Sequence, residues 1–384
     1  MEEVGLTMAS VQAKFWCGKR VLLTGHTGFK GSWMSLWLQS MGAQVHGLAL
    51  EPSTAPALFH EARVVDAMAG SVIGDIRGFD IVLDAMRQAR PDVVIHMAAQ
   101  PLVRYSYAAP VETYATNVMG TVHVLEAARQ VGTARAIVNV TTDKCYENSD
   151  DPLPGSTGQP RGSSTPSGFS KAFDESDPMG GYDPYSSSKG CSELVTSAYR
   201  RSYFQHGGIA LASARAGNVI GGGDWSADRL VPDILRSFEQ RQPVLIRHPA
   251  AVRPWQHVLE PLGAYLVLAE RLFESGQAYA QAWNFGPEHD DARAVEWIVR
   301  RMADLWGSGA TWRVDGGSHP HEAQTLRLDI TKARQRLAWR PRWNLETALL
   351  KTVEWHRAWL DGVDARQTCL QQISQFESTS GNPT

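Results

Sequence analysis

Residues 24–31 read Thr-Gly-His-Thr-Gly-Phe-Lys-Gly, and they follow directly on a short apolar run at residues 20–24. We interpret the run as a buried strand and the residues after it as a turn that opens a helix. Gly25 permits the tight turn, Gly28 lets the backbone approach a pyrophosphate, and Gly31 permits close packing of helix on strand. Exposed N–H groups and the helix dipole then favour an anion. At a first strand-turn-helix, these glycines favour a dinucleotide site over a plain structural turn.

The alternation of short apolar runs with helical patterns continues to about residue 214. Parallel strands are covered by helices on both faces, so they form near-continuous runs of Val, Ile and Leu, as these do. The sequence therefore predicts an α/β fold on a parallel sheet. The predicted strands are 20–24, 44–50, 71–74, 92–96, 136–141 and 209–214, and the predicted helices are 32–41, 79–89, 111–130 and 187–205.

The pattern changes after Gly217, where proline, tryptophan and arginine become frequent. Helices are predicted at 230–238 and 262–273, separated by irregular turns. We expect a smaller C-terminal α/β domain that covers the substrate and is interleaved with the end of the sheet domain. The predicted division gives 14–214 and about 252–286 to the sheet domain, and 215–251 and 287–372 to the smaller one. Residues 149–170, rich in Pro, Gly, Ser and Thr, predict a flexible loop, and 377–384 a disordered tail.

Composition limits the class of function. Hydrophobic residues at 43% and charged residues at 20% are typical of a globular protein, and a net charge of -3 gives no electrostatic case for nucleic acid or an anionic membrane. The four scattered cysteines have neither disulfide nor zinc spacing and suggest a reducing compartment. No apolar stretch approaches the ~20 residues that span a bilayer, and the acidic opening does not resemble a signal peptide. We therefore expect a cytoplasmic enzyme.

The choice between NAD and NADP depends on the residue after the second predicted strand. An acidic side chain there bonds the ribose diol and repels a 2′-phosphate. The chain offers Glu51, slightly late for that role, and no arginine in the glycine loop. NAD is therefore favoured. Asp75, after the third predicted strand, has two interpretations: it meets the adenine, or it caps the next helix.

Tyr185 and Lys189 stand one helical turn apart. A lysine ammonium beside a phenol lowers the pKa of the phenol and lets a tyrosinate accept a proton from an alcohol. The alternative is an accidental pair on an exposed helix. Thr142, at the end of an earlier buried strand, is placed to bond the same substrate oxygen. Together with the glycine loop these residues resemble the short-chain dehydrogenase/reductase superfamily, which implies a Rossmann-type parallel sheet flanked by helices.

Asp143 and Lys144 directly follow Thr142, at the carboxyl end of a predicted strand where such folds bind ligands. An alcohol dehydrogenase needs no further acid–base groups there, whereas a sugar dehydratase does. The run Thr-Asp-Lys-Cys-Tyr at 142–146 resembles the CDP-glucose 4,6-dehydratase family, where related dTDP-glucose dehydratases carry Thr-Asp-Glu. Similar stretches extend from about Phe15 to Gln372. Between Asn148 and Gly180, family members usually have a shorter segment. The longer segment of this chain leaves two properties undecided: how the site closes over the substrate, and which sugar it selects.

The resemblance implies a reaction. Tyr185, Thr142 and Lys189 oxidise C4 of CDP-glucose, Asp143 protonates O6 as it leaves as water, and CDP-4-keto-6-deoxyglucose results. Lys144 stands where related enzymes use glutamate to move the C5 proton; it is either that base or a group that orients Asp143 or the substrate. The alternatives are a dehydratase or epimerase for another nucleotide sugar, and a catalytically silent NAD-binding regulator on the same fold.

The resemblance also implies the binding residues. NAD would contact Gly25, Thr27, Gly28, Phe29, Lys30, Gly31, Glu51, Asp75, Ile76, Ala98, Ala99, Gln100 and Asn117, together with Tyr185 and Lys189. The nucleotide sugar would contact Arg104, Arg215, Asn218, Arg229, Arg253 and His257. Arginine forks suit phosphate oxygens, although any one of these arginines can instead serve packing.

Three further expectations complete the prediction. A homodimer through the helices at 111–130 and 187–205 is implied by the resemblance, as is a pathway that supplies deoxysugars for a bacterial surface polysaccharide. The run His-Pro-His-Glu at 319–322 suggests a metal site, but the proline between the histidines and the lack of a third ligand at fixed spacing argue against one. We expect no metal, and a loop beside the nucleotide there.

Overall fold

The computed structural model describes residues 8–148, 172–307, 309–315 and 326–379. The predicted loop at 149–170, the run at 319–322 and residues 380–384 lie outside the described residues.

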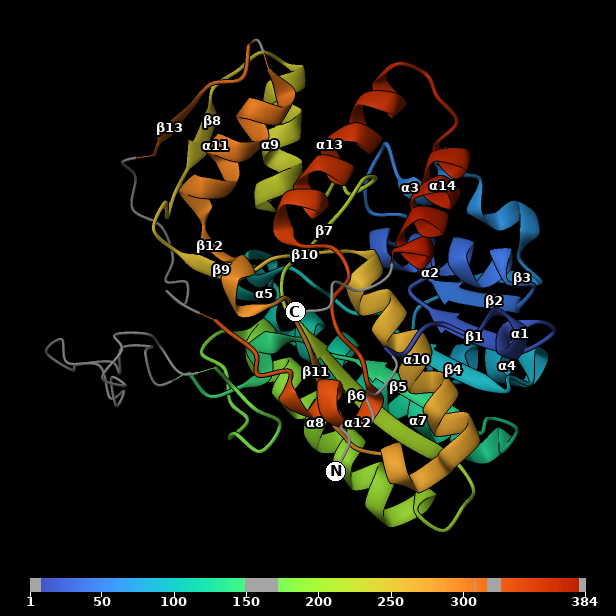
Figure 1. Cartoon of the computed structure of the whole chain (residues 1–384). Helices are drawn as coiled ribbons and strands as arrows, with labels where there is room; N and C mark the ends of the chain where they lie inside the picture. The colour runs from blue at the N-terminus through green and yellow to red at the C-terminus, as the bar shows by residue number, and fades with distance from the viewer. Residues whose placement is uncertain (1–7, 149–171, 308, 316–325, 380–384) are drawn as a thin grey trace, which may run out of the picture.

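Seven parallel strands form the central sheet, in the order β11-β6-β5-β4-β1-β2-β3 (Figure 1). This confirms the predicted parallel α/β fold, and all six predicted strands form. The seventh, β11, was not predicted. The strands are β1 (Arg20–Thr24), β2 (Gln44–Ala49), β3 (Gly70–Ile73), β4 (Val93–His96), β5 (Ala136–Val140), β6 (Ala210–Ala216) and β11 (Ala282–Phe285).

The order of the strands reverses between β1 and β4, which pair side by side. In open parallel sheets, ligands bind outside the carboxyl ends of the strands at such a reversal. The turn after β1 and the segment after β4 meet closely there, since a Cβ on Gly25 would lie 2.8 Å from the backbone N of Ala98. The topology thus places the glycine loop at the expected ligand crevice.

Helices cover both faces of the sheet because alternate strand residues point to opposite sides. Val21 and Leu23 join one core with α2 (Phe29–Ser40) and α10 (Leu259–Ser275), whereas Leu22 joins a second core with α4 (Phe79–Ala89) and α7 (Gly120–Val131). The predicted helix at 111–130 consists of α6 (Pro110–Tyr114), the π-turn η2 (Ala115–Met119) and α7. The predicted helix at 187–205 is α8 (Pro184–Tyr199) followed by the π-turn η4 (Arg200–Phe204).

A smaller group of elements packs around a third core at the upper left of Figure 1. It contains α9 (Leu230–Glu239), α11 (Val295–Trp306) and the parallel pair β8 (Val244–Ile246) and β13 (Trp312–Val314), with α13 (Leu345–Leu360) against them. These elements agree with the expected smaller α/β part after Gly217.

The C-terminal helix α14 (Ala365–Ser378) extends past the predicted start of the tail. It packs on α2, with the rings of Trp37 and Phe376 5.7 Å apart, and also on α13, where Trp355 Nε1 donates to Cys369 Sγ at 3.2 Å. Trp37 Nε1 also donates to the Glu377 carboxylate at 2.8 Å. The predicted tail was therefore wrong at Glu377 and Ser378, which are helical because their helix is anchored on a buried tryptophan.

The remaining elements are short. They are α1 (Ala13–Trp16), α3 (Leu58–Glu61), η1 (Val64–Ala67), α5 (Val103–Ala108), η3 (Asp143–Cys145), β7 (Val219–Ile220), β9 (Val252–Pro254), β10 (Gln256–His257), η5 (Gly276–Tyr279), η6 (His289–Asp291), β12 (Ala292–Ala294) and α12 (Thr331–Leu337). All four cysteines are free thiols. Within the described ranges, no helix combines the length and apolar character needed to cross a membrane.

Candidate active site

A cavity of about 660 Å³ lies where the carboxyl ends of the central strands meet the smaller part of the chain. Its lining includes the residues that follow β1, β2, β3, β4, β5 and β6, and segments at 216–233 and 244–255. This volume is within the range of ~300–1,000 Å³ that small-molecule sites occupy. One cavity therefore collects residues predicted for the cofactor and residues predicted for the substrate.

The glycine loop forms one wall of the cavity. Gly25 has a φ of 80°, and a Cβ on Gly31 would lie 2.0 Å from the carbonyl oxygen of Gly25, so both positions exclude side chains. Gly28 is exposed and precedes α2 as its N-cap, without a side-chain cap for the first N–H groups of the helix. An anion at this wall would meet backbone N–H groups and the positive end of the helix dipole.

Most of the predicted cofactor residues line this cavity. They are Gly25, Thr27, Gly28, Phe29, Lys30, Gly31, Glu51, Asp75, Ile76, Ala98 and Ala99, together with Tyr185 and Lys189.

Gln100 and Asn117 are not part of the cavity lining and lie buried behind it. The Asn117 side chain accepts from the backbone N of Gln100 at 2.8 Å and donates to its carbonyl oxygen at 3.1 Å. Asn117 Nδ2 also donates to Ser188 Oγ at 2.8 Å. Their polar groups are occupied within the protein, where they brace the helix that carries Tyr185 and Lys189.

Asp75 faces the cavity but does not cap a helix. Its carboxylate accepts from the backbone N of Arg77 at 2.8 Å and pairs with the Arg77 guanidinium at 2.5 Å. Helix α4 begins after Gly78, which is its N-cap. The capping interpretation of Asp75 was therefore wrong, and its place in the cavity lining remains.

Helix α8 begins immediately before the predicted catalytic tyrosine. Asp183 is its N-cap and accepts from the backbone N of Ser186 at 2.9 Å, and Pro184 occupies the first helical position. Tyr185 and Lys189 then line the cavity from one face of the helix, and Lys189 Nζ donates to the carbonyl oxygen of Val140 at 3.2 Å.

Burial perturbs both catalytic candidates on α8. It raises the pKa of the Tyr185 phenol to about 12, while a hydrogen bond with Thr142 acts in the opposite direction. Burial also lowers the pKa of the Lys189 ammonium to about 8. The Glu193 carboxylate opposes this effect, because its negative charge favours the charged form of Lys189. Lys30, which donates to the Tyr265 hydroxyl at 3.3 Å, has its pKa lowered to about 7 by burial and then by Lys189. A perturbed Tyr/Lys pair in a cavity is typical of a proton-transfer site.

Thr142, Asp143 and Lys144 continue the same wall at the end of β5. Thr142 Oγ1 donates to Asp143 Oδ1 at 3.0 Å. Asp143 is 1% exposed, and its Oδ2 has no hydrogen-bond partner within the described part of the chain. Lys144 Nζ lies 3.6 Å from Asp143 Oδ1 and donates to Asn218 Oδ1 at 3.5 Å. A buried carboxyl with one unpaired oxygen in a cavity wall is suited to exchange a proton with a ligand.

Four of the six predicted substrate residues also line the cavity: Arg104, Asn218, Arg229 and Arg253. Arg104 pairs with Asp228 at 3.0 Å and Arg229 with Asp224 at 3.1 Å. These arginines lie on the side of the cavity formed by α5 and the segments after β6.

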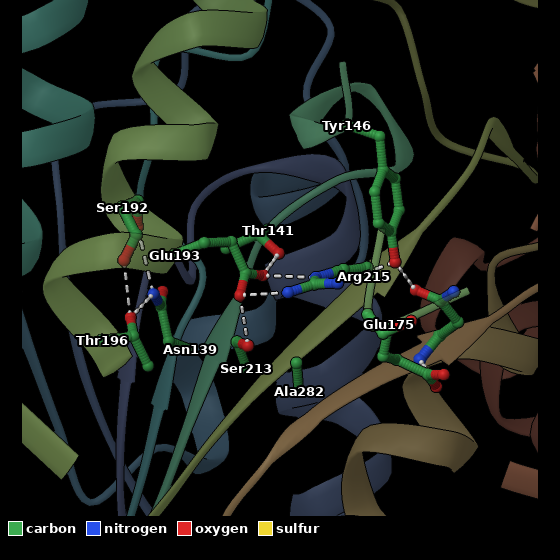
Figure 2. Close-up of polar contacts among 12 residues, drawn as sticks. Asn139, Thr141, Tyr146, Glu175, Ser192, Glu193, Thr196, Ser213, Arg215 and Ala282 are labelled. Atoms are coloured by element: carbon green, nitrogen blue, oxygen red, sulfur yellow. Dashed lines mark hydrogen bonds and ion pairs between the residues drawn. The ribbon is translucent and has the colours of Figure 1, made fainter. Parts of the chain in front are cut away.

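Arg215 and His257 are not part of the cavity lining. Arg215 points into the protein, where its guanidinium pairs with Glu193 at 2.8 Å, as Figure 2 shows. His257 is fully buried between Trp33 and Trp343, with ring centroids 6.1 and 4.9 Å away. Each stands on a strand, and successive strand residues point to opposite faces, so a motif match does not show which way either side chain points.

Asp183 and Arg247 are among the residues of the cavity lining that were not predicted. Asp183 has a signal in the sequence, since Asp-Pro before a helical pattern is a strong helix start. Arg247 directly follows β8 and lies 3.6 Å from Asp228. It has no comparable signal, because its place depends on how the smaller part folds onto the sheet. Among the described residues, no group of His, Cys, Asp and Glu is arranged to hold a metal ion.

Comparisons with known proteins agree with this geometry. The family model described as GDP-mannose 4,6 dehydratase matches residues 22–352. Over 376 residues, the chain is 52% identical to the CDP-glucose 4,6-dehydratase of Salmonella typhimurium, which covers 96% of this chain and 99% of that protein. A probable dTDP-glucose 4,6-dehydratase of Sinorhizobium fredii is 27% identical over 350 residues, 88% of this chain and 92% of the relative.

Solved structures share the fold. A UDP-glucose 4-epimerase from Thermotoga maritima, solved with UDP-glucose, has a TM-score of 0.72 and 20% identity, covering 88% of this chain and 99% of its own. A dTDP-glucose 4,6-dehydratase from Streptomyces venezuelae, solved with NAD and TYD bound, has a TM-score of 0.71 and 24% identity, covering 90% and 99%.

Proposed function

The chain belongs to the GDP-mannose 4,6-dehydratase family, and we propose that it converts CDP-glucose to CDP-4-keto-6-deoxyglucose with loss of one water. This activity makes it a hydro-lyase. The observation that carries the proposal is the meeting, in one cavity, of the Tyr185–Lys189 pair with the buried Asp143 carboxyl. The 52% identity over nearly the full length of a CDP-glucose 4,6-dehydratase supports the choice of nucleotide.

The residues at the glycine loop fit NAD. Gly28 leaves the start of α2 open to the cavity, and the ends of β1 and β2 contribute Glu51 and no arginine, which favours a free ribose diol over a 2′-phosphate. Bound NAD would supply a hydride acceptor for the sugar and return the hydride later in the same cycle. Relatives of this fold solved with NAD support the assignment.

Tyr185 accepts the proton of the C4 hydroxyl as that carbon is oxidised. Burial holds the pKa of Tyr185 at about 12, so the phenolate needs help from the groups around it. Thr142 and the guanidinium of Arg229 lower the pKa of the phenol against burial. The ammonium of Lys189, one turn away on the same helix face, favours the phenolate as well. The oxidation therefore depends on all three side chains acting together.

Asp143 donates a proton to O6, which then leaves as water. Oxidation at C4 makes the C5 proton acidic, so its removal and the loss of O6 follow. The contacts of Lys144 with Asp143 and Asn218 suit both of its roles: it takes the C5 proton, or it orients the carboxyl and the substrate. On the other side, Asn218, Arg229 and Arg253 bind the diphosphate, with Arg104 and Arg247 nearby in the lining.

The protein also forms a homodimer in this proposal. Large apolar side chains are exposed on the two helical segments that the family resemblance assigns to the interface. They are Val111, Tyr114 and Met119 on α6 and η2, and Leu194 and Tyr203 on α8 and η4. An apolar group of this kind on a globular protein favours burial against a partner. We further propose that the enzyme acts in the cytoplasm and supplies deoxysugars for a bacterial surface polysaccharide such as O-antigen.

A substrate panel tests the proposal. The purified protein is incubated with CDP-, dTDP-, UDP- and GDP-glucose, and the products are analysed by mass spectrometry. We expect loss of one water from the CDP sugar without net accumulation of NADH. Water loss from another sugar instead would keep the chemistry and overturn the choice of cytidine. An epimerised product of unchanged mass, or no reaction with NAD bound, would overturn the dehydratase assignment.

A further inference from the structure

A buried ion pair joins the catalytic helix to the sheet behind the cavity wall. Glu193 lies on α8 one turn beyond Lys189, and Arg215 lies on β6. The guanidinium of Arg215 bonds both carboxylate oxygens, with Nε 2.9 Å from Oε1 and Nη2 2.8 Å from Oε2. Each side chain is 4% exposed. Such a two-point contact fixes the angle between the partners as well as their separation.

The Glu193 carboxylate also accepts two hydroxyl groups. Thr141 Oγ1 donates to it at 2.5 Å and Ser213 Oγ at 2.6 Å (Figure 2). Burial alone would raise the pKa of Glu193, but Arg215 and the two hydroxyls lower it overall, so the group is ionised. A buried ion pair whose remaining hydrogen-bonding groups also have partners is held in one geometry, because any displacement would leave a buried charge without partners.

Arg215 makes a second connection on its other side. Its Nη1 donates to the Tyr146 hydroxyl at 2.7 Å, and that hydroxyl donates to Asn284 Oδ1 on β11 at 2.7 Å. The Tyr146 ring stacks on Phe173, with centroids 5.0 Å apart. Thr141 and Tyr146 are the residues immediately outside 142–145. One ion pair therefore holds both ends of the short segment that contains Thr142, Asp143 and Lys144.

The same carboxylate is the anion that acts on Lys189. Lys189 is faced by Cys145 from η3, Lys30 from α2 and His96 from β4. Burial raises the pKa of the Cys145 thiol, so it is neutral, and burial lowers the pKa of His96 to about 3, so it is neutral as well. Glu193 is then the negative charge that favours the ammonium of Lys189.

We propose that Glu193 and Arg215 are positioning residues of the dehydratase: together they hold residues 142–145 at Thr141 and Tyr146, and they set a fixed negative charge one turn from Lys189. They touch neither substrate nor cofactor, and act through the residues that do. The inference rests on the proposed function, because it assigns a role in C4 oxidation and water loss.

The dependence of kcat on pH separates this role from a purely structural one. In the wild-type enzyme, kcat falls as pH rises through the pKa of Lys189, about 8, because the ammonium is lost. We call this fall in kcat at high pH the alkaline limb. Glu193→Gln removes the charge but keeps the shape of the side chain, so the midpoint of the alkaline limb should fall by about one pH unit. KM for CDP-glucose should stay within about twofold of the wild-type value. Glu193→Asp keeps a carboxylate and restores the limb.

Arg215→Lys tests whether the ion pair holds residues 142–145 in place, and it leaves the charge of Glu193 unchanged. Lysine retains the positive charge but cannot bond Glu193 at two points and Tyr146 as well, so kcat falls about tenfold while the alkaline limb stays in place. Glu239→Gln is the matched control, since Glu239 pairs with buried His356 and neither residue lines the cavity. It keeps the wild-type kcat and pH limb, and thermal unfolding shows whether each variant is folded.

The outcomes are distinguishable. If Glu193→Gln and Arg215→Lys fold and keep both the wild-type kcat and the wild-type limb, the pair is only structural and the inference fails while the proposed function stands. If Glu193→Gln does not fold, Glu193→Asp is compared with the wild type in its place. A shift of the alkaline limb in Glu193→Asp, which keeps the carboxylate, overturns the inference. If the wild-type protein dehydrates no CDP-glucose, the proposed function fails and takes the inference with it.

Discussion

The hydroxyl of Thr142 donates to the carboxylate of Asp143 at 3.0 Å, and its interaction with Tyr185 lowers the pKa of that phenol against the effect of burial. Since a threonine hydroxyl carries one proton, it donates either to Asp143 or to the Tyr185 phenolate, and not to both at once. The groups assigned to oxidation at C4 and to water loss at C6 are therefore linked through one side chain.

Thr142→Val should slow both steps, because it keeps the shape of the side chain but breaks this link. We expect kcat to fall about 10- to 100-fold, with little change in KM. Steady-state assays by mass spectrometry measure this. Thr352→Val, which removes a buried hydroxyl bonded to Ala348 on α13, is the control. Equal kinetics in the two variants would contradict the link.

Tyr185→Phe should stop oxidation at C4 without loss of cofactor binding. The substitution removes the group that accepts the proton, and we expect a fall in kcat of about 10²- to 10⁴-fold. Quenching of protein fluorescence by added NAD checks binding, and thermal unfolding checks the fold. A variant that turns over at the wild-type rate would show that another group is the base.

Asp143→Asn should separate oxidation from water loss. The amide cannot donate an acidic proton to O6, so the 4-keto sugar that still carries O6 should accumulate, while the dehydrated product forms about 10²- to 10⁴-fold more slowly. Quenched time points analysed by mass spectrometry distinguish the two species, because the product has one oxygen atom fewer than the 4-keto sugar that still carries O6. If both steps slow equally, Asp143 is not the specific acid for O6.

Glu260 predicts a dependence of stability on pH. It is fully buried, and burial raises the pKa of its carboxyl to about 8, although the backbone N–H groups of Trp343 and Arg342 oppose this. A folded pKa above the unfolded value means that the stabilisation is complete at low pH and is lost as pH rises through about 8. Glu260→Gln should therefore match the wild type near pH ~4 but exceed it near pH ~9, by on the order of 3 kcal/mol.

Chemical denaturation at the two pH values measures this difference. Glu260 lies outside the cavity lining, so activity near neutral pH should be retained. A wild-type free energy of unfolding that does not fall relative to the variant on the alkaline side would contradict the assignment of a neutral buried carboxyl.

The predicted residues that do line the cavity depend on local sequence. Gly25 and Gly31 exclude side chains at the two ends of a seven-residue loop, and Tyr185 and Lys189 are one turn apart, so spacing alone brings each set together. Helix α4 has the predicted bounds for the same reason, because its apolar face repeats regularly.

The sequence did not show which predicted residues lie behind the cavity wall, because their partners lie far away in the chain. Arg215 carries a positive charge that suits a phosphate. Its guanidinium instead pairs with Glu193 from another element, inside the protein. Gln100 and Asn117 likewise satisfy each other behind the wall. Strand β11 is short, and its place beside β6 depends on a pairing that no local pattern contains. Glu193 was not among the predicted site residues, although its carboxylate bonds Thr141, Ser213 and Arg215 behind the cavity.

The most direct test of the proposed reaction uses CDP-glucose labelled with deuterium at C4. The hydride that leaves C4 should return to C6 of the same sugar, so the product should have lost one water and retained the label in its new methyl group. Mass spectrometry and deuterium NMR locate the label. A dehydrated product with its deuterium lost to solvent, or a label still at C4, would contradict the account.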